Sequence, residues 1–169
     1  MKKNFFLALA LMGFTISSNA QATATATATA TIVTPISISK TADMNFGNVA
    51  VQAGIGGTVI LAPAGTRTTG GAGGVTLPAT AGTVTAAAFT VNGNGSYTYA
   101  ITLPGTVTLT RASGSETMDA TSFTSTPSGT GTLSGGTQNL TVGATLTVAA
   151  AQVPGVYTSG NFNVTVNYN

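Results

Sequence analysis

The sequence predicts an all-β protein, an antiparallel β-sandwich, and three observations support that fold class. First, apolar and polar residues alternate over many short segments, which is the period of a strand with one buried face. Second, Gly, Asn and Pro turn signals separate these segments at short intervals. Third, no window after residue 20 shows the 3.6-residue apolar period of a helix. One sheet alone would leave its apolar face in water, so two sheets are expected to pack together.

Residues 1–20 have the features of a signal peptide, which is expected to be cleaved off. Lys2 and Lys3 give a positive start, residues 5–16 are apolar, and residues 18–20 (SNA) offer small side chains for cleavage. The apolar run is shorter than the roughly 20 residues that cross a bilayer. We therefore predict an exported protein without membrane insertion, located in the periplasm, on the outer cell surface or outside the cell.

Residues 21–31 form an N-terminal extension of unusual composition, ahead of one β-sandwich domain predicted for residues 32–169. Ala and Thr alternate over residues 22–31, so one face of an extended chain carries only methyl groups. The members of this alanine face are Ala22, Ala24, Ala26, Ala28 and Ala30, and Ile32 continues it. Two interpretations stay open, namely a frayed low-complexity tail and a strand that completes a sheet, including a sheet of another molecule.

Five strands are predicted between residues 32 and 103. Residues 32–39 form the first, with Pro35 indicating an edge or a bulge. Residues 45–51 and 57–62 follow, joined by a turn around Gly54, and residues 87–91 form the fourth. The next four residues, Asn-Gly-Asn-Gly at 92–95, predict a hairpin to a strand over 96–103, because Asn and Gly accept the positive φ of a tight turn.

The second half of the domain continues the same pattern. Strands are predicted over residues 106–111, 117–125, 139–142 and 145–149, with the first of them following a Pro104-Gly105 turn. The Pro154-Gly155 turn precedes the cleanest alternation in the chain, a terminal strand over residues 161–168. Its apolar face is predicted to consist of Phe162, Val164, Val166 and Tyr168.

Charge is almost absent from the chain once the signal peptide is removed. Residues 21–169 contain three basic and three acidic residues and carry a net charge of zero, whereas the full chain carries +2. Three scattered cations neutralise few phosphates, so nucleic acid is not an expected partner. A neutral surface lacks the repulsion that keeps proteins monomeric, so self-association with neighbouring subunits is expected.

The sequence lacks the residue types that most catalytic and metal sites use. It contains no His and no Cys, the residues of the commonest general base, of thiolate catalysis and of most zinc sites. Glu116 and Asp119 are close in sequence, but residues three apart in a strand point to opposite faces, so they are not expected to act as a catalytic pair. The Gly-rich segment 70–74 lacks the Lys and helix of a phosphate-binding loop. We therefore expect no enzyme activity, no cofactor and no metal site.

Several segments, taken in order, resemble a bacterial family of secreted domains known as domain of unknown function 4402. The matching segments are 43–49 (DMNFGNV), 89–93 (FTVNG), 99–104 (YAITLP), 142–146 (VGATL), 154–157 (PGVY) and 162–168 (FNVTVNY). That family is similar in turn to the spore coat protein U domain and to subunits of archaic chaperone–usher pili. Those subunits are immunoglobulin-like sandwiches that lack one strand.

The resemblance implies an immunoglobulin-like, pilin-like sandwich with one strand supplied in trans. It implies a periplasmic chaperone and an outer-membrane usher as partners, with the N-terminal extension of the next subunit as the final strand. It places Phe162, Val164, Val166 and Tyr168 beside the open groove and residues 22–31 in the donor role. The function expected on this basis is a non-enzymatic structural or fimbria-like subunit of the cell surface.

A second class of function stays open, a monomeric extracellular module that binds a ligand or glycan. Such modules usually present clustered aromatic or acidic side chains on loops. The tyrosines available are Tyr97, Tyr99, Tyr157 and Tyr168, and most of them lie inside predicted strands, where packing is the expected role.

Overall fold

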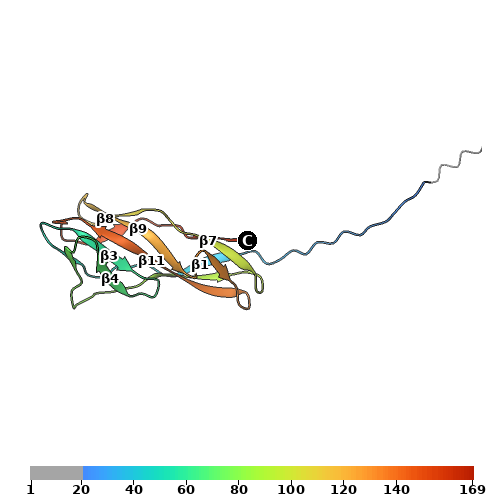
Figure 1. Ribbon diagram of the computed structural model, residues 1–169, viewed down its shortest axis with the longest axis horizontal. Coiled ribbons are helices and arrows are strands. Elements are labelled where there is room, and N and C mark those ends of the chain that lie inside the picture. The colour runs from blue at the N-terminus through green and yellow to red at the C-terminus, as the bar shows by residue number, and fades with distance from the viewer. Residues whose placement is uncertain (1–20) are drawn as a thin grey trace, which may run out of the picture. The chain divides into compact units, whose positions relative to one another are not determined.

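The computed structural model describes residues 21–169, and its strands confirm the predicted all-β sandwich (Figure 1). The predicted signal peptide lies outside the described residues, and residues 33–169 form one compact unit. All strand pairs in this unit are antiparallel. The strands are β1 (Ser37–Ala42), β2 (Ala50–Val51), β3 (Gly57–Leu61), β4 (Arg67–Gly70), β5 (Val75–Thr76), β6 (Ala87–Asn92), β7 (Thr98–Thr102), β8 (Val107–Arg111), β9 (Thr117–Thr126), β10 (Thr130–Thr132), β11 (Thr137–Val148), β12 (Tyr157–Ser159) and β13 (Thr165–Tyr168).

The largest sheet is organised around the long strand β11. It follows the order β1-β6-β11-β9-β8-β12. Residues 137–142 of β11 pair with β6, whereas residues 144–148 pair with β3, which pairs in turn with β4. The opposite edge of β11 pairs with β9. The sheet therefore forks along one edge of β11, because this strand is long enough to hold two partners in succession.

A second sheet, in the order β10-β7-β13, covers one half of the large sheet. Figure 1 shows β1, β7 and the C-terminus at this end of the unit, with β3, β4 and β8 at the other. Tyr99 of β7 is fully buried, and its hydroxyl donates a hydrogen bond of 2.8 Å to Gln138 on β11. Its ring occupies the space beside Gly131 on β10, where a Cβ atom would clash. The core between these sheets consists of Ala87, Val91, Tyr99, Leu133, Leu140, Val142, Val164 and Val166.

The other half of the large sheet packs on irregular chain and on the short pair β2–β5. Its core consists of Phe46, Val59, Leu61, Val75, Ala120, Ala144, Leu146 and Val148. Arg67 fastens the irregular layer, because its guanidinium donates to the backbone carbonyls of Phe46, Asn48 (2.7 Å) and Ala81 (3.4 Å). This cation has a structural role that satisfies backbone acceptors.

The structure corrects several predicted strands. Segments 139–142 and 145–149 are one strand, β11, because Gly143 admits the backbone of Leu61 at close range instead of ending the strand. The predicted strand over 32–39 starts only at Ser37, after Pro35, and the one over 45–51 shrinks to β2. Strands β4, β5, β10 and β12 were missed, since they are two to four residues long and rich in Thr and Gly.

The predicted hairpin at residues 92–95 is wrong. Strand β6 pairs with β1 and β11, while β7 pairs with β10 and β13 in the other sheet. The connection instead bonds to Gly136, which accepts from the Gly93 N–H at 2.8 Å and donates to the Gly95 carbonyl at 2.9 Å. Asn and Gly favour any tight turn, so the same residues occur in a connection between two sheets as in a hairpin.

A β-bulge in β9 redirects the side chains of its second half. Ser122 has a φ of 50° and interrupts the pairing with β11, whose register shifts between Gly143 and Thr145. Inward positions change from Ala120 to Phe123 as a result. Phe123 then packs against Phe162, with 5.6 Å between the ring centroids.

Candidate functional site

The first candidate site lies between the free edges of β1 and β13. Within residues 21–169, β1 pairs only with β6 and β13 only with β7, so each strand leaves one edge outside the ladders. The Tyr168 hydroxyl at the end of β13 donates a 2.8 Å hydrogen bond to the carbonyl of Thr34, just before β1. The two free edges are therefore neighbours. We call the region bounded by Ser37–Ala42 and Thr165–Tyr168 the seam.

The four C-terminal residues predicted for the site all face the core beside the seam. Val164 and Val166 are buried, at 9% and 7% exposure, and Phe162 and Tyr168 are half-buried. Their alternation is the predicted one, but only Val166 and Tyr168 belong to β13. Residues 160–164 precede it outside any described strand.

The core beside the seam is only partly covered. Ile36, Ile38, Phe89 and Ile101 pack against it and are half-buried. Phe89 sits in the middle of β6, between β1 and β11, a position where a complete opposing layer would bury an aromatic ring. Apolar surface therefore remains in contact with water along the seam, and an added strand would remove it from water.

Tyr168 joins three segments at one end of the seam. Besides its bond to Thr34, the hydroxyl accepts a 2.6 Å hydrogen bond from the Asn94 N–H. The ring meets Tyr97 edge-on, with 5.5 Å between centroids, and lies so close to Gly93 that a Cβ there would clash with it. One side chain thus ties the start of β1, the β6–β7 connection and β13 together.

The predicted residues of the extension lie outside the compact unit 33–169. Ala22, Ala24, Ala26, Ala28, Ala30 and Ile32 are exposed, with Ile32 at 94%, and none takes part in a described strand pair. The donor role of the extension therefore stays a prediction.

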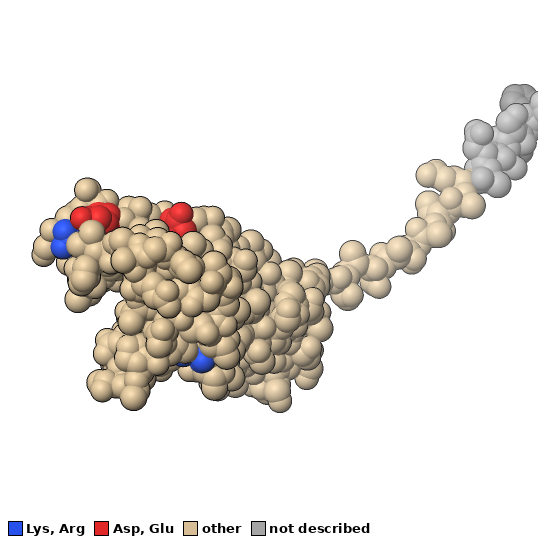
Figure 2. Space-filling model, turned by 60° about the vertical axis from the view of Figure 1, so that its left-hand side comes forward, with Lys and Arg blue, Asp and Glu red and all other residues tan. Residues whose placement is uncertain are grey.

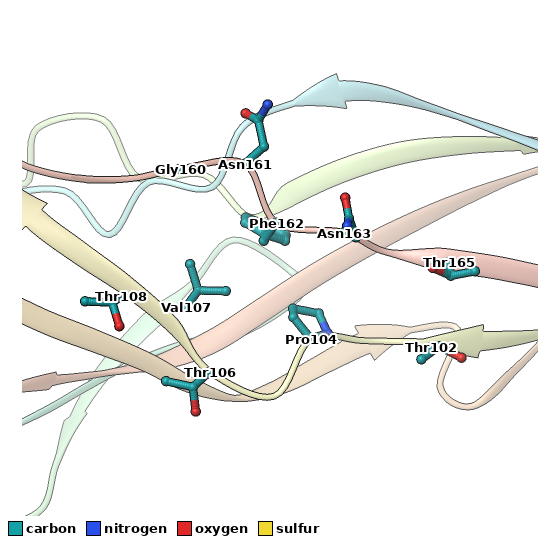
Figure 3. Close-up of a pocket in the computed structure, with 10 residues that line it drawn as sticks. All are labelled: Thr102, Pro104, Thr106, Val107, Thr108, Gly160, Asn161, Phe162, Asn163 and Thr165. Carbon is teal, nitrogen blue, oxygen red and sulfur yellow. The ribbon is translucent and has the colours of Figure 1, made fainter.

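The second candidate site is a cleft that the sequence did not reveal (Figure 3). Two neighbouring segments cross there from one sheet to the other, one linking β7 to β8 and the other linking β12 to β13. Ladder pairs stand at both ends of the crossing, Leu109 with Ser159 and Thr102 with Thr165. Between these two pairs the segments are not paired with each other, and a cleft of about 500 Å³ lies there.

The lining of the cleft is uncharged and consists of Thr102, Pro104, Thr106, Val107, Thr108, Gly160, Asn161, Phe162, Asn163 and Thr165. Figure 3 shows Phe162 on one wall, with Val107 and Pro104 on the other. The only sequence signals at this place are the breaks at Pro104-Gly105 and at Gly160. These two breaks lie opposite each other only because both segments cross from one sheet to the other at the same place.

Charged side chains are few on the face shown in Figure 2, and those described are engaged with neighbours. Lys40 pairs with Asp43 at 2.6 Å, and Arg111 Nε pairs with Glu116 at 2.6 Å. The hydrogen bond from Arg111 lowers the pKa of Glu116 and raises the pKa of Arg111. Asp119 accepts a 2.6 Å bond from Thr108 instead of facing Glu116.

The described part of the chain offers no metal centre and no membrane helix. Among residues 21–169, no three His, Cys, Asp or Glu side chains gather at one place. The same residues contain no helix long and apolar enough to cross a membrane.

Comparison with known proteins assigns the domain to a family. The family described as "Domain of unknown function (DUF4402)" matches residues 36–168, which is nearly the whole compact unit. No curated protein and no solved structure matches the chain. The match confirms the family predicted from the six matching segments between residues 43 and 168. The chain therefore belongs to the DUF4402 family.

Proposed function

We propose that this protein is an exported, non-enzymatic structural subunit of the cell surface, which assembles by β-strand addition. The observation that carries the proposal is the seam, where two free strand edges adjoin beside a partly covered core. Exposed strand edges are templates for pairing with another chain, and monomeric proteins usually block them with charge or Pro. Lys40 is the one charged residue within β1, and β13 has none.

The strand added at the seam would be the N-terminal extension of a second copy. Eleven residues in extended conformation span about 36 Å, which exceeds the length of either β1 or β13. The alanine face would lie on the half-buried residues of the seam, while the threonines face outward. Each methyl group contributes little, about 0.8 kcal/mol for a buried CH₂-sized group, so main-chain hydrogen bonds would provide most of the affinity.

The pilin-like relation expected from the sequence would add two partners to this proposal. A periplasmic chaperone would protect the seam before assembly, and an outer-membrane usher would be the place where the extension of the next subunit replaces it. The competing function is a monomeric extracellular ligand-binding module, in which the extension is only a linker.

The test compares substitutions on the two faces of the extension in the chain 21–169. Ala26→Asp would place a charge against the apolar seam, whereas Thr27→Asp would place the same charge outside. We expect light scattering and negative-stain microscopy to show oligomers or fibres for wild type and Thr27→Asp, and monomers for Ala26→Asp and for a chain lacking residues 21–31. Neither residue belongs to the compact unit, so its folding is not at stake.

Two results would refute the assembly mechanism. One is a wild-type chain that stays monomeric at high concentration. The other is equal assembly of Ala26→Asp and Thr27→Asp, since a strand that adds to a sheet must distinguish its two faces.

A further inference from the structure

The cleft between residues 102–108 and 160–165 has a chemistry that the assembly proposal does not use. Its lining carries six hydrogen-bonding side chains, Thr102, Thr106, Thr108, Asn161, Asn163 and Thr165. Within residues 21–169, only Thr108 among them forms a side-chain hydrogen bond, to Asp119. Five of these lining residues therefore carry a hydroxyl or amide group without a side-chain partner in the described chain, so their hydrogen-bonding capacity is open to a ligand at the cleft or its rim.

The backbone around the cleft adds further donors and acceptors. The ladder between the two segments stops at Ser159–Leu109 and resumes at Thr165–Thr102. In the described chain, residues 160–164 and 103–106 form no backbone hydrogen bonds with each other. Their N–H and C=O groups have no backbone partner across the cleft and are available to water or to a polar ligand.

One wall of the cleft also offers an apolar platform. Phe162 lines the cleft, and Phe123 supports its ring from the core side at 5.6 Å between centroids. Val107 and Pro104 stand on the facing wall (Figure 3). A rigid aromatic ring among neutral hydrogen-bonding groups suits a ligand that has both C–H faces and many hydroxyl groups.

Charge and size narrow the class of ligand. No residue of the lining is charged, so the cleft offers an anion or a cation nothing to pair with. Its volume of about 500 Å³ lies within the range of roughly 300–1,000 Å³ for small-molecule sites. The strand pairs at both ends limit the length of the cleft to about six extended residues, or about 20 Å. A long extended peptide therefore cannot pass between the two segments.

We propose that this cleft binds a neutral saccharide of one to a few rings. The hydroxyl groups of the sugar bond to the Thr and Asn side chains and to the open backbone groups, while a C–H face packs on Phe162. Of the seam residues the site uses only Thr165, and the N-terminal extension is not part of it, so an unassembled subunit is expected to bind the saccharide.

The chain 21–169 is first screened on an array that carries neutral, sialylated and sulfated oligosaccharides. The strongest neutral hit is then titrated by calorimetry against variants. Asn161→Ala with Asn163→Ala should weaken binding at least tenfold. The matched control, Asn139→Ala with Asn167→Ala, removes two exposed amides of β11 and β13 away from the cleft and should leave affinity unchanged.

A second variant blocks the cleft without disturbing the fold. Gly160 lines the cleft and a Cβ there meets no atom within 4 Å, so Gly160→Phe is expected to fold and is designed to obstruct the cleft with a bulky ring. Gly54 is equally open but lies in the loop between β2 and β3, which makes Gly54→Phe the control. We expect Gly160→Phe to abolish binding and Gly54→Phe to retain it, with equal melting temperatures.

Three outcomes would overturn the proposal. The first is an array on which no neutral saccharide binds, or on which only charged glycans bind. The second is a hit whose affinity survives both the double Asn variant and Gly160→Phe. The third is a synthetic peptide of residues 22–32 that competes for the same side chains, which would make the cleft a peptide site.

Discussion

The hydroxyl of Tyr168 offers a sharp test of how the seam is held together. Tyr168→Phe removes one oxygen atom and leaves the ring in place. That oxygen accepts from the Asn94 N–H at 2.6 Å and donates to the Thr34 carbonyl at 2.8 Å. The substitution therefore cuts the polar link between the start of β1, the β6–β7 connection and β13 while it preserves the edge-on contact with Tyr97.

The expected loss of stability follows from these two hydrogen bonds. Each contributes a net 0.5–1.5 kcal/mol or so, and Tyr168 is half-buried, so water replaces part of the loss. We expect the free energy of unfolding to fall by about 1–2 kcal/mol. With an m value of about 2 kcal/mol/M in urea, the midpoint should fall by about 0.5–1 M.

Urea unfolding followed by circular dichroism measures this shift, with Tyr97→Phe as the matched control. Tyr97 is 45% exposed, and its hydroxyl makes no hydrogen bond to residues 21–169. The control should unfold at the wild-type midpoint with the same m value. A Tyr168→Phe midpoint equal to wild type, or an equal fall in both variants, would refute the role assigned to the Tyr168 hydroxyl.

Two further substitutions test the electrostatics and the packing. Because the Arg111 hydrogen bond lowers the pKa of Glu116 in the folded state, the pair stabilises the fold above the unfolded-state pKa, and this contribution is lost as pH falls through the folded-state pKa. Glu116→Gln should therefore melt slightly below wild type at neutral pH, and the difference in melting temperature should shrink as pH falls through the lowered pKa of Glu116. A difference in melting temperature that is constant with pH would contradict this. Gly143→Ala should lower the free energy of unfolding by about 1–3 kcal/mol, because its Cβ would meet the Leu61 carbonyl. Gly54→Ala in open space should change it little, and equal effects of the two alanine variants in urea unfolding would show that Gly143 is not a close-contact position.

Local pattern was enough to predict the all-β class and the inward-facing side chains of some segments. Alternation over residues 161–168 predicted which side chains turn inward, and the burial of Val164 and Val166 agrees with it. The period of 2 is a property of the extended backbone itself, so it survives whatever the strand later pairs with. The same holds for residues 57–62, which appear as β3 almost unchanged.

Local pattern failed where two distant segments had to be matched. The Asn-Gly turn at residues 92–95 has the same backbone requirements in a hairpin and in a link between sheets. The turn residues therefore could not show that β6 and β7 belong to different sheets. Gly143 resembles a break until β3 is seen to approach it. The bulge at Ser122, which brings Phe123 to Phe162, exists only against the register of β11.

The amino-acid sequence by itself determined the all-β class, the family, the near-absence of charge and the inward face of the C-terminal residues, because these depend on composition and on neighbours along the chain. The tertiary structure decided the rest. It made β1 and β13 adjoining free edges, and it opened a cleft between residues 102–108 and 160–165. Both sites arise from pairing between segments far apart in the sequence, and the choice of partner is settled by burial of the whole core and not by any local preference.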